Sequence, residues 1–359
     1  MSANNGRIEQ IQKMLERNVR VLPRGGGTKP ALSTPARDEL IVEMAGFSGM
    51  IEYVPEEFTF TAYAGTPLWQ VVRILSEHGQ YLPFDPPLVE RGATLGGTVA
   101  SGLSGSGRYR FGGVRDFILG VRFIDGRGDL ISAGGKVVKN VAGYDFAKLM
   151  VGSLGGLGIL VELSFKVFPR PQAYATWHRS FDSLEDALQM MKRASKSQIP
   201  LEAMDLEAQK PGFSLWLRIG GISSILPSRI GRLLEIIGEG HMLEETDDEQ
   251  CWNRVREFSW VPEGNTLIKV ALTPRSIPAL ESYLDGKPVL RRYAAGGQVA
   301  WIAQDDSPRI LDPVLKDRGL SGLVIWGPPG FPHLGEFRGK SFLRRVKESL
   351  DPAYRFTEV

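Results

Sequence analysis

The placement of glycine limits how this chain can fold more than any other feature of its sequence. Many of its 42 glycines are crowded into residues 25–27, 92–113, 126–135 and 152–158. Glycine is used where the backbone needs a positive φ or where another group must approach it closely. The stretch PRGGGTK at 23–29 follows the apolar VRVL and leaves three consecutive side chains empty, which a turn alone rarely needs. We therefore expect a ligand to contact the backbone there, although this stretch by itself also fits a flexible surface turn.

The two commonest phosphate-binding motifs are absent from the sequence. A dinucleotide fingerprint G-x-G-x-x-G needs a third glycine, but Pro30 stands there after Gly25 and Gly27, and the glycines near 105 fail in the same way. A P-loop G-x-x-x-x-G-K-[ST] would need glycine where this chain has Leu334. A glycine loop can still bind a diphosphate without either motif, because successive backbone N–H groups form an anion-binding nest.

Two stretches of the chain are candidates for such nests. RGGGT at 24–28 has a guanidinium before its glycines and a hydroxyl after them. ATLGGTVASGLSGSGRYRFGG at 93–113 contains seven glycines and lacks the apolar periodicity of a buried helix. We expect Thr94 and the pair Gly96–Gly97 to begin a short helix whose N–H groups face a phosphate. One long ligand with a diphosphate explains both stretches more simply than two loose turns.

Composition excludes several other kinds of protein. With 43 basic and 41 acidic residues the formal charge is +2, so no basic surface is expected for nucleic acid. The one cysteine excludes a disulfide framework and a cysteine-ligated iron–sulfur cluster, and four scattered histidines argue against zinc. We expect no metal, and any redox chemistry needs an organic cofactor. No stretch resembles a signal peptide or a transmembrane segment, so a cytoplasmic location is expected.

The apolar pattern indicates an α+β chain in which helices and strands alternate. A first helix is predicted with Ile8 and Leu15 on its buried face. A second helix is expected to begin at the N-cap Thr66 and to bury Val72. Asp-Gly at 125–126 predicts a turn between two strands, because glycine supplies a positive φ at little cost.

Four ordered stretches give the chain a family resemblance. They are PRGGGT, ATLGGTVASGLSG, VRDFILGVRFIDGRGDLISAGGKVVKNVAGYD and LMVGSLGGLGILVELSFKVFPRP. Together they resemble the FAD-binding domain of the vanillyl-alcohol oxidase, or PCMH-type, flavoprotein superfamily, and within it the glycolate oxidase and D-lactate dehydrogenase branch. KNVAGYDFAKLMVGS, GVRDF and the short total length are most similar to the E-type FAD-binding subunit of the three-subunit bacterial glycolate oxidase.

The resemblance implies the fold class and the division into domains. The expected architecture is α+β, with a PCMH-type FAD-binding domain of two α+β subdomains at 1–171 and a smaller α+β cap domain at 172–338. A C-terminal helix and tail at 339–359 would return toward the FAD domain. The break PRP at 169–171 supports the first of these boundaries.

The resemblance also implies which residues bind FAD. RGGGT matches the first pyrophosphate loop, ATLGG and SGLSG match a second segment, and GSLGGLGI matches a family segment written G-S-E-G-T-L-G-I. This chain has Leu154 in place of the acid and Gly156 in place of threonine, so a contact made by that carboxylate is lost. The expected cofactor-binding residues are Arg24, Gly25, Gly26, Gly27, Thr28, Asp85, Pro86, Thr94, Leu95, Gly96, Gly97, Ser101, Gly102, Gly105, Gly152, Ser153, Gly158 and Ile159.

The same analogy bears on how the flavin is held. Family members with a covalently attached flavin often use a histidine in or near the first glycine loop, and the first histidine of this chain is His78. The resemblance therefore implies noncovalent FAD. It also places Lys139 and Tyr144 near the flavin, where both can serve merely to support the loop.

No catalytic residue is assigned from the sequence. Relatives that oxidise 2-hydroxy acids have a stretch H-x-G-D-G-N-x-H, which this chain lacks, and we interpret His241 in GEGHML as a loop residue. Oxidation of a 2-hydroxy acid needs a base near the hydroxyl and a cation for the carboxylate. Candidate cations exist, but no candidate base does. The cations are Arg108, Arg110, Arg291 and Arg292.

Three functions follow as hypotheses. The first is an FAD-binding subunit of glycolate oxidase, with a sister flavoprotein subunit and an iron–sulfur subunit as partners. The second is a self-sufficient flavin-dependent 2-hydroxy-acid dehydrogenase, and the third is a degenerate structural subunit that no longer binds FAD. With the first hypothesis, association with the inner face of the membrane through the partner subunits is an alternative to a free cytoplasmic location.

Overall fold

The computed structural model describes residues 2–17, 19–35, 38–135, 145–330 and 332–357. The chain folds into two compact units. Unit 1 comprises Met1–Ser104, Gly113–Pro169 and Arg338–Val359, and unit 2 comprises Gly105–Gly112 and Arg170–Phe337. The sequence predicts domain boundaries after residues 171 and 338. Whether the parts on either side of them fold independently stays a prediction.

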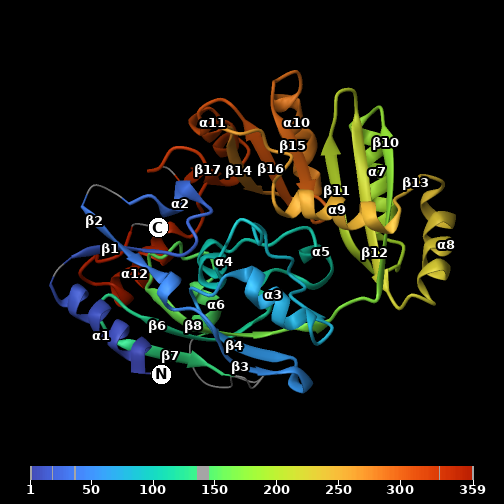
Figure 1. The fold of residues 1–359 in the computed structure, drawn as a ribbon. Coiled ribbons are helices and arrows are strands. Elements are labelled where there is room, and N and C mark those ends of the chain that lie inside the picture. The colour runs from blue at the N-terminus through green and yellow to red at the C-terminus, as the bar shows by residue number, and fades with distance from the viewer. Residues whose placement is uncertain (1, 18, 36–37, 136–144, 331, 358–359) are drawn as a thin grey trace. The chain divides into compact units, whose positions relative to one another are not determined.

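Three sheets lie in the described part of unit 1 (Figure 1). The largest is antiparallel, with strands in the order β3 (Met50–Val54), β4 (Thr59–Tyr63), β8 (Ile159–Lys166), β6 (Ile118–Ile124) and β7 (Leu130–Gly134). The others pair β1 (Arg20–Arg24) with β2 (Glu39–Glu43) in parallel, and β5 (Gln80–Tyr81) with β9 (Phe168–Pro169) in antiparallel. Central β8 buries Val161, Leu163 and Phe165 completely, as period-2 alternation predicts for a strand covered on its apolar face.

The helices of unit 1 range from four to 15 residues in length. They are α1 (Ser2–Glu16), α2 (Pro30–Ser33), α3 (Leu68–Ser76), α4 (Leu95–Ser101), α6 (Phe146–Met150) and α12 (Lys340–Leu350), with 3-10 turns η1 (Met44–Gly46), η2 (Pro55–Glu57) and η3 (Val114–Asp116). In α1, Ile8 is 7% exposed and Leu15 2%, because these positions lie on the face of the helix that packs against the rest of unit 1.

Helix α3 departs from the sequence prediction in its N-cap and in its buried face. Its N-cap is Pro67, because the Thr66 hydroxyl donates to the Tyr63 carbonyl at 2.7 Å instead of capping the first turn. Val72, expected to be buried, is 40% exposed, whereas Leu68 is fully buried. A short helix with one packed row of side chains leaves the neighbouring position in solvent.

One apolar core joins the two ends of the chain within unit 1. It contains Ile8 of α1, Val21 of β1, Ile159 of β8 and Phe356 of the C-terminal tail, and the last three are fully buried. The tail also pairs with β1, because Val21 N–H donates to the Arg355 carbonyl at 2.8 Å. The strand that leads into the glycine triplet is therefore held by residues more than 300 positions later in the sequence.

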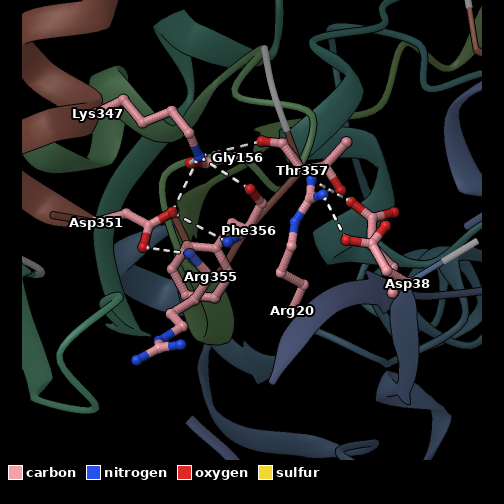
Figure 2. A network of polar contacts seen from close by, with 9 residues as sticks. Arg20, Asp38, Gly156, Lys347, Asp351, Arg355, Phe356 and Thr357 are labelled. Carbon is pink, nitrogen blue, oxygen red and sulfur yellow. Dashed lines mark hydrogen bonds and ion pairs between the residues drawn. The ribbon is translucent and has the colours of Figure 1, made fainter. Parts of the chain in front are cut away.

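A buried lysine fixes this tail (Figure 2). Lys347 of α12 is 6% exposed, and its ammonium donates to Asp351 Oδ2 at 3.0 Å and to the Gly156 carbonyl at 2.9 Å. It also donates to the carbonyls of Phe356 and Thr357, each at 3.1 Å. A charge that finds a carboxylate and three carbonyls is well satisfied in the interior.

Unit 2 is built on one long antiparallel sheet. Its described strands lie in the order β13 (His241–Met242), β10 (Ala173–Phe181), β12 (Phe213–Gly221), β11 (Leu201–Ala208), β15 (Leu290–Ala294), β16 (Val299–Gln304), β14 (Thr266–Ala271), β17 (Ser321–Trp326) and β18 (His333–Gly335). Its helices are α5 (Arg108–Phe111), α7 (Leu184–Ser195), α8 (Leu226–Ile237), α9 (Glu245–Arg256), α10 (Ile277–Leu284) and α11 (Leu311–Asp317), with 3-10 turns η4 (Pro274–Ser276) and η5 (Pro308–Ile310). Strands and helices in this proportion confirm the predicted α+β class.

A short segment from the first half of the chain belongs to unit 2. Within Gly105–Gly112, the Ser106 hydroxyl donates to Asp205 Oδ2 at 2.5 Å, and Arg110 forms an ion pair with Glu202. Asp205 is fully buried and also accepts from Arg292 Nε at 2.8 Å. No local sequence signal marks this change of unit, because it depends on contacts across about 100 residues of chain.

No helix in the described part of the chain is both long enough and apolar enough to cross a membrane.

Candidate functional site

The buried strand β1 positions the glycine triplet at residues 25–27, which follows it directly. Its Val21 and Leu22 are buried, and the strand ends at Arg24 directly before Gly25. The first two glycines are required by close packing, because a Cβ on Gly25 would lie 2.2 Å from Thr94 Oγ1 and one on Gly26 would lie 2.0 Å from the Gly92 carbonyl oxygen. Neither distance is possible for a real side chain.

Gly27 is a glycine for a different reason. Its φ is +63° and nothing lies within 4 Å of the position its Cβ would take. The left-handed conformation is open to glycine at no steric cost. Among the described residues, none accepts a hydrogen bond from the N–H groups of Gly25, Gly26 or Gly27. These three donors are thus available to a ligand, as an anion-binding nest requires.

The second segment packs directly against the first. Thr94 is the N-cap of α4 and its Oγ1 accepts from Gly97 N–H at 3.2 Å, as the sequence predicts. The N–H groups of Leu95 and Gly96 donate to the carbonyls of Thr66 and Ala64, at 2.9 and 2.6 Å. The expectation that the first N–H groups of α4 face a phosphate is therefore corrected: the protein itself occupies them.

The third segment, at 152–159, rests on α4. Gly152 N–H donates to the Val99 carbonyl at 3.0 Å, and Leu154 N–H donates to the Ala100 carbonyl at 2.9 Å. Leu154, which stands where the resemblance predicts an acid, has a φ of +50°. A non-glycine residue in this region is uncommon, and it is retained where the surrounding structure fixes the backbone.

These three segments line one cavity, whose enclosed volume is about 80 Å³. The polar groups that converge on it, rather than its size, mark it as a candidate cofactor site. Of the expected cofactor-binding residues, the following line it: Gly25, Gly26, Gly27, Thr28, Thr94, Gly96, Gly97, Ser101 and Gly158. The structure thus brings residues from three distant parts of the sequence to one site.

Other expected residues do not line the cavity. Leu95 and Ile159 are fully buried in the core, and Ser153 is 3% exposed, while Gly102 and Gly152 supply turns with φ of +62° and +81°. These residues support the cavity wall without touching its interior. Leu95 and Ile159 pack beneath it, and the two glycines set the path of the backbone. A sequence motif marks a whole segment and does not separate residues that touch a ligand from those that support it.

Asp85, Pro86 and Gly105 lie elsewhere. Asp85 has a φ of +52° and Pro86 is buried, and neither lines the cavity of unit 1. Gly105 belongs to unit 2. Lys139 and Tyr144, expected near the flavin, lie outside the described residues.

Arg24 does not provide the cation that the sequence predicts beside the nest. Its Nε donates to Glu43 Oε1 at 3.0 Å, and a second bond joins Nη2 to the same oxygen. Arg24 and Glu43 line an adjoining surface hollow that shares the glycine triplet with the cavity, and they are absent from the lining of the cavity itself. The parallel pairing of β1 with β2 brings Arg24 opposite Glu43, which no local pattern reveals.

Lys29 is the residue that sequence reasoning missed. It follows the glycine loop directly, lines the cavity, and is 7% exposed. Its ammonium donates to Thr28 Oγ1 at 3.1 Å, and burial lowers the pKa of Lys29 to about 8. The signal was present in PRGGGTK, since the last residue of that stretch adjoins the proposed nest, but a lysine near a loop is usually a surface residue.

Three of the four candidate substrate cations pair with carboxylates, whereas the buried Nε of Arg108 has no partner among the described residues. Arg291 forms a bidentate pair with Glu281, at 2.7 and 2.6 Å, and Arg292 pairs with Asp205 and Glu207. Hydrogen bonds and the charge of Glu281 keep the pKa of Arg291 above its usual value despite burial.

None of the histidines of unit 2 is buried, and His241, interpreted from the sequence as a loop residue, is exposed in the short strand β13. His178 stacks on Trp216 with ring centroids 4.4 Å apart and lies edge-on to His241 at 4.8 Å. Burial and the charge of His241 lower the pKa of His178. Among the described residues there is no group of three histidine, cysteine or acidic side chains suited to a metal.

The glycine cavity fits a dinucleotide cofactor. Its wall offers three consecutive unpaired N–H groups and one buried ammonium, a donor set suited to a diphosphate. The Ser101 hydroxyl also lines the cavity, but it donates to the Gly97 carbonyl at 2.7 Å. The close approaches at Gly25 and Gly26 keep the two loops together, so that the nest has a fixed shape.

Comparison with known proteins defines the class. The family model of an FAD binding domain matches residues 7–134. Two solved structures of alkyldihydroxyacetonephosphate synthase have TM-scores of 0.68 and 0.70 over 97% of this chain and 73% of theirs, at 17% and 16% identity, which shows the fold alone. Fold and site together define an FAD-dependent oxidoreductase with a PCMH-type FAD-binding domain, and its cofactor is FAD, as the sequence predicted.

The particular family follows from a longer match. The chain is 32% identical over 353 residues to the glycolate oxidase subunit GlcE of Escherichia coli (strain K12), covering 96% of this chain and 93% of that protein. It is 31% identical over 186 residues to the glycolate oxidase subunit GlcD of Bacillus subtilis (strain 168), covering 50% of this chain and 39% of that protein. The chain belongs to the family of the glycolate oxidase subunit GlcE, which confirms the predicted resemblance.

Proposed function

We propose that this chain is the FAD-binding subunit of a glycolate oxidase complex that oxidises glycolate to glyoxylate. A sister flavoprotein subunit and an iron–sulfur subunit complete the complex, and the two electrons removed from glycolate pass to the iron–sulfur subunit. The observation that carries the proposal is the cavity of unit 1, where three glycine segments meet in a chain similar to GlcE over 96% of its length.

The residues of the cavity bind and orient a cofactor. Its described lining has no aspartate, glutamate or histidine, and its one titratable side chain, Lys29, lies beside the glycine nest with its ammonium bonded to Thr28 Oγ1. We therefore assign no substrate base to this cavity. When bound, FAD supplies a two-electron acceptor. The N–H groups of residues 25–27 hold its diphosphate, and the absence of a histidine before His78 supports noncovalent binding.

The test is flavin content in the native complex. We expect the purified complex to contain one FAD for each copy of this chain, released by heat or acid because the flavin is noncovalent. The isolated full-length chain should show flavin absorbance, or regain it when FAD is added. A chain that never takes up FAD would contradict the proposal and would favour a degenerate structural subunit.

Adding substrate separates this proposal from the alternative of a self-sufficient dehydrogenase. In the complex, glycolate should bleach the flavin absorbance. In the isolated chain, neither glycolate nor D-lactate should do so, because the sequence lacks the H-x-G-D-G-N-x-H stretch of the relatives that oxidise 2-hydroxy acids. Rapid bleaching in the isolated chain would replace the proposal by a self-sufficient 2-hydroxy-acid dehydrogenase.

The proposal extends to location. A subunit that delivers electrons through an iron–sulfur partner would work in the cytoplasm or at the inner face of the membrane. Fractionation of cells that produce the complex, with and without its partner subunits, distinguishes the two.

A further inference from the structure

Lys29 is the one charged residue among the described residues that line the glycine cavity. It is 7% exposed, and no carboxylate borders the cavity with it. Its ammonium has three N–H donors, of which the described residues satisfy one, through Thr28 Oγ1 at 3.1 Å. The described interior of unit 1 thus contains a cation without a counter-ion.

A second buried lysine of unit 1 is satisfied in a different way. Lys347 is 6% exposed and bonds to the Asp351 carboxylate and to three carbonyls. Buried ammonium groups are costly unless they are paired in this way. Lys29 lacks such partners among the described residues, and burial accordingly lowers its pKa to about 8.

The elements packed around the cavity leave the charge of Lys29 uncompensated. β1 and β2 bring two ion pairs, Arg24 with Glu43 and Arg20 with Glu39. α2, α4 and residues 152–158 contain no charged side chain. Each described carboxylate on these elements thus has an arginine partner, while the free N–H groups of the glycine triplet lie two to four residues before Lys29 in the chain.

We propose that the Lys29 ammonium is the counter-ion of the FAD diphosphate. This assignment rests on the proposed function, since it takes FAD as the ligand. The dianionic diphosphate would accept from the free N–H groups at residues 25–27 and from Lys29. Arg24, the cation that the sequence suggested for this role, is held by Glu43 instead.

The experiment titrates the full-length apo chain with FAD and follows flavin fluorescence. Loss of a charge-assisted hydrogen bond predicts that Lys29→Met weakens FAD binding about 10- to 100-fold. Lys29→Arg, which keeps the charge, should recover part of that loss. The matched control Lys148→Met removes a 44% exposed lysine that pairs with Asp145 on α6, and it should change the dissociation constant less than about twofold.

The dependence on pH gives an independent readout. In the apo chain the pKa of Lys29 is about 8, and the diphosphate would raise it by favouring the ammonium. Binding then takes up a proton above pH 8, so wild-type affinity should fall as pH rises from about 8 to 9, by up to about tenfold per unit. Lys29→Met and Lys29→Arg should lack this decline. Equal pH profiles in wild type and Lys29→Met would overturn the proposal.

Unfolding of the apo variants separates binding from folding. Lys29→Met removes an unpaired buried charge, so the apo chain should unfold at the same denaturant concentration as wild type or higher. Weak FAD binding together with undiminished apo stability supports the counter-ion role. Equal FAD affinity in wild type and Lys29→Met overturns it.

Failure of the proposed function looks different in the same experiment. A wild-type chain that binds no FAD contradicts that function, and ADP then serves as the probe of the diphosphate site. ADP binding that Lys29→Met weakens would uphold the assignment of Lys29 to a diphosphate. A wild-type chain that binds neither FAD nor ADP would overturn it.

Discussion

Gly25, Gly26 and Gly27 are adjacent in the sequence but are required for two different physical reasons. The first two allow the loop to pack against Thr94 and Gly92, and the third adopts a left-handed φ of +63°. The sequence showed that three glycines were needed there. Only the contacts of the folded chain show that two of them act through van der Waals exclusion and one through backbone conformation.

This difference predicts unequal effects of alanine at two neighbouring positions. Gly26→Ala places a methyl group 2.0 Å from a backbone oxygen, so the two loops must separate. We expect a loss of stability of about 2–3 kcal/mol and loss of FAD binding. Gly27→Ala meets no atom and should cost about 1–2 kcal/mol, the strain of a left-handed alanine. Denaturant unfolding and FAD titration measure both.

The exposed Gly6 in α1 is the control for this comparison. Its Cβ would meet nothing within 4 Å, so Gly6→Ala should raise stability by about 0.5–1 kcal/mol through helix propensity. Equal losses at positions 26 and 27 would contradict the packing explanation.

At the scale of elements, helix α12 and the tail act as a clamp on the cofactor segments. Lys347 bonds to the carbonyl of Gly156 in the third segment (Figure 2). Val21 of β1 pairs with the tail at Phe356. Gly126 is part of the same contact, since its Cβ would lie 2.3 Å from Asp351 Oδ1. The sequence predicted a positive φ for Gly126; instead Gly128 has that conformation, at +88°, and Gly126 makes room for the tail.

Removing the lysine should release this clamp. Lys347→Met leaves the buried Asp351 carboxylate without its charge partner, which predicts a loss of about 3–5 kcal/mol in the free energy of unfolding. We also expect faster FAD release, because Gly156 loses its anchor. Urea unfolding and the rate of flavin release test these two effects.

The same helix offers a matched control. Arg344 pairs with Glu348 but its side chain is 76% exposed, so Arg344→Met should cost less than about 1 kcal/mol. A Lys347→Met effect no larger than that of Arg344→Met would show that the clamp contributes nothing measurable.

At the scale of the whole molecule, each of the polar networks described above lies inside one unit. The cavity and the Lys347 contacts belong to unit 1, whereas Asp205, Ser106 and Arg292 belong to unit 2. Two compact units with separate networks predict separate thermal transitions.

Ligand removal and mutation should therefore act on different transitions. Removing FAD should lower the melting temperature of unit 1 alone, because unit 1 loses the binding free energy of the cofactor. Asp205→Ala leaves Arg292 buried without its main partner, so it should lower the melting temperature of unit 2 alone, through a loss of about 3–5 kcal/mol in free energy of unfolding. Calorimetry of wild type and Asp205→Ala, each with and without FAD, is the measurement. A single transition shifted by both changes would show that the two units unfold together.

Local patterns and ordered motifs were sufficient for the class of this protein. The α+β class followed from alternation along strands such as β8, because that signal depends on neighbours in the sequence. FAD as cofactor and the glycolate oxidase subunit family followed from the resemblance that the ordered motifs carry. The burial of Val161, Leu163 and Phe165 follows from the same period.

The electrostatics of the site and the division of the chain, in contrast, follow from tertiary contacts. Parallel pairing of β1 with β2 places Arg24 beside Glu43, with which it forms an ion pair. Packing of the loops buries Lys29. Ser106 bonds to Asp205, about 100 residues later in the sequence. Charge partners and burial depend on which distant segments come together in space. The run of glycines was enough to predict a diphosphate-binding nest at 25–27, whereas the cation beside that nest was set by how the chain folds.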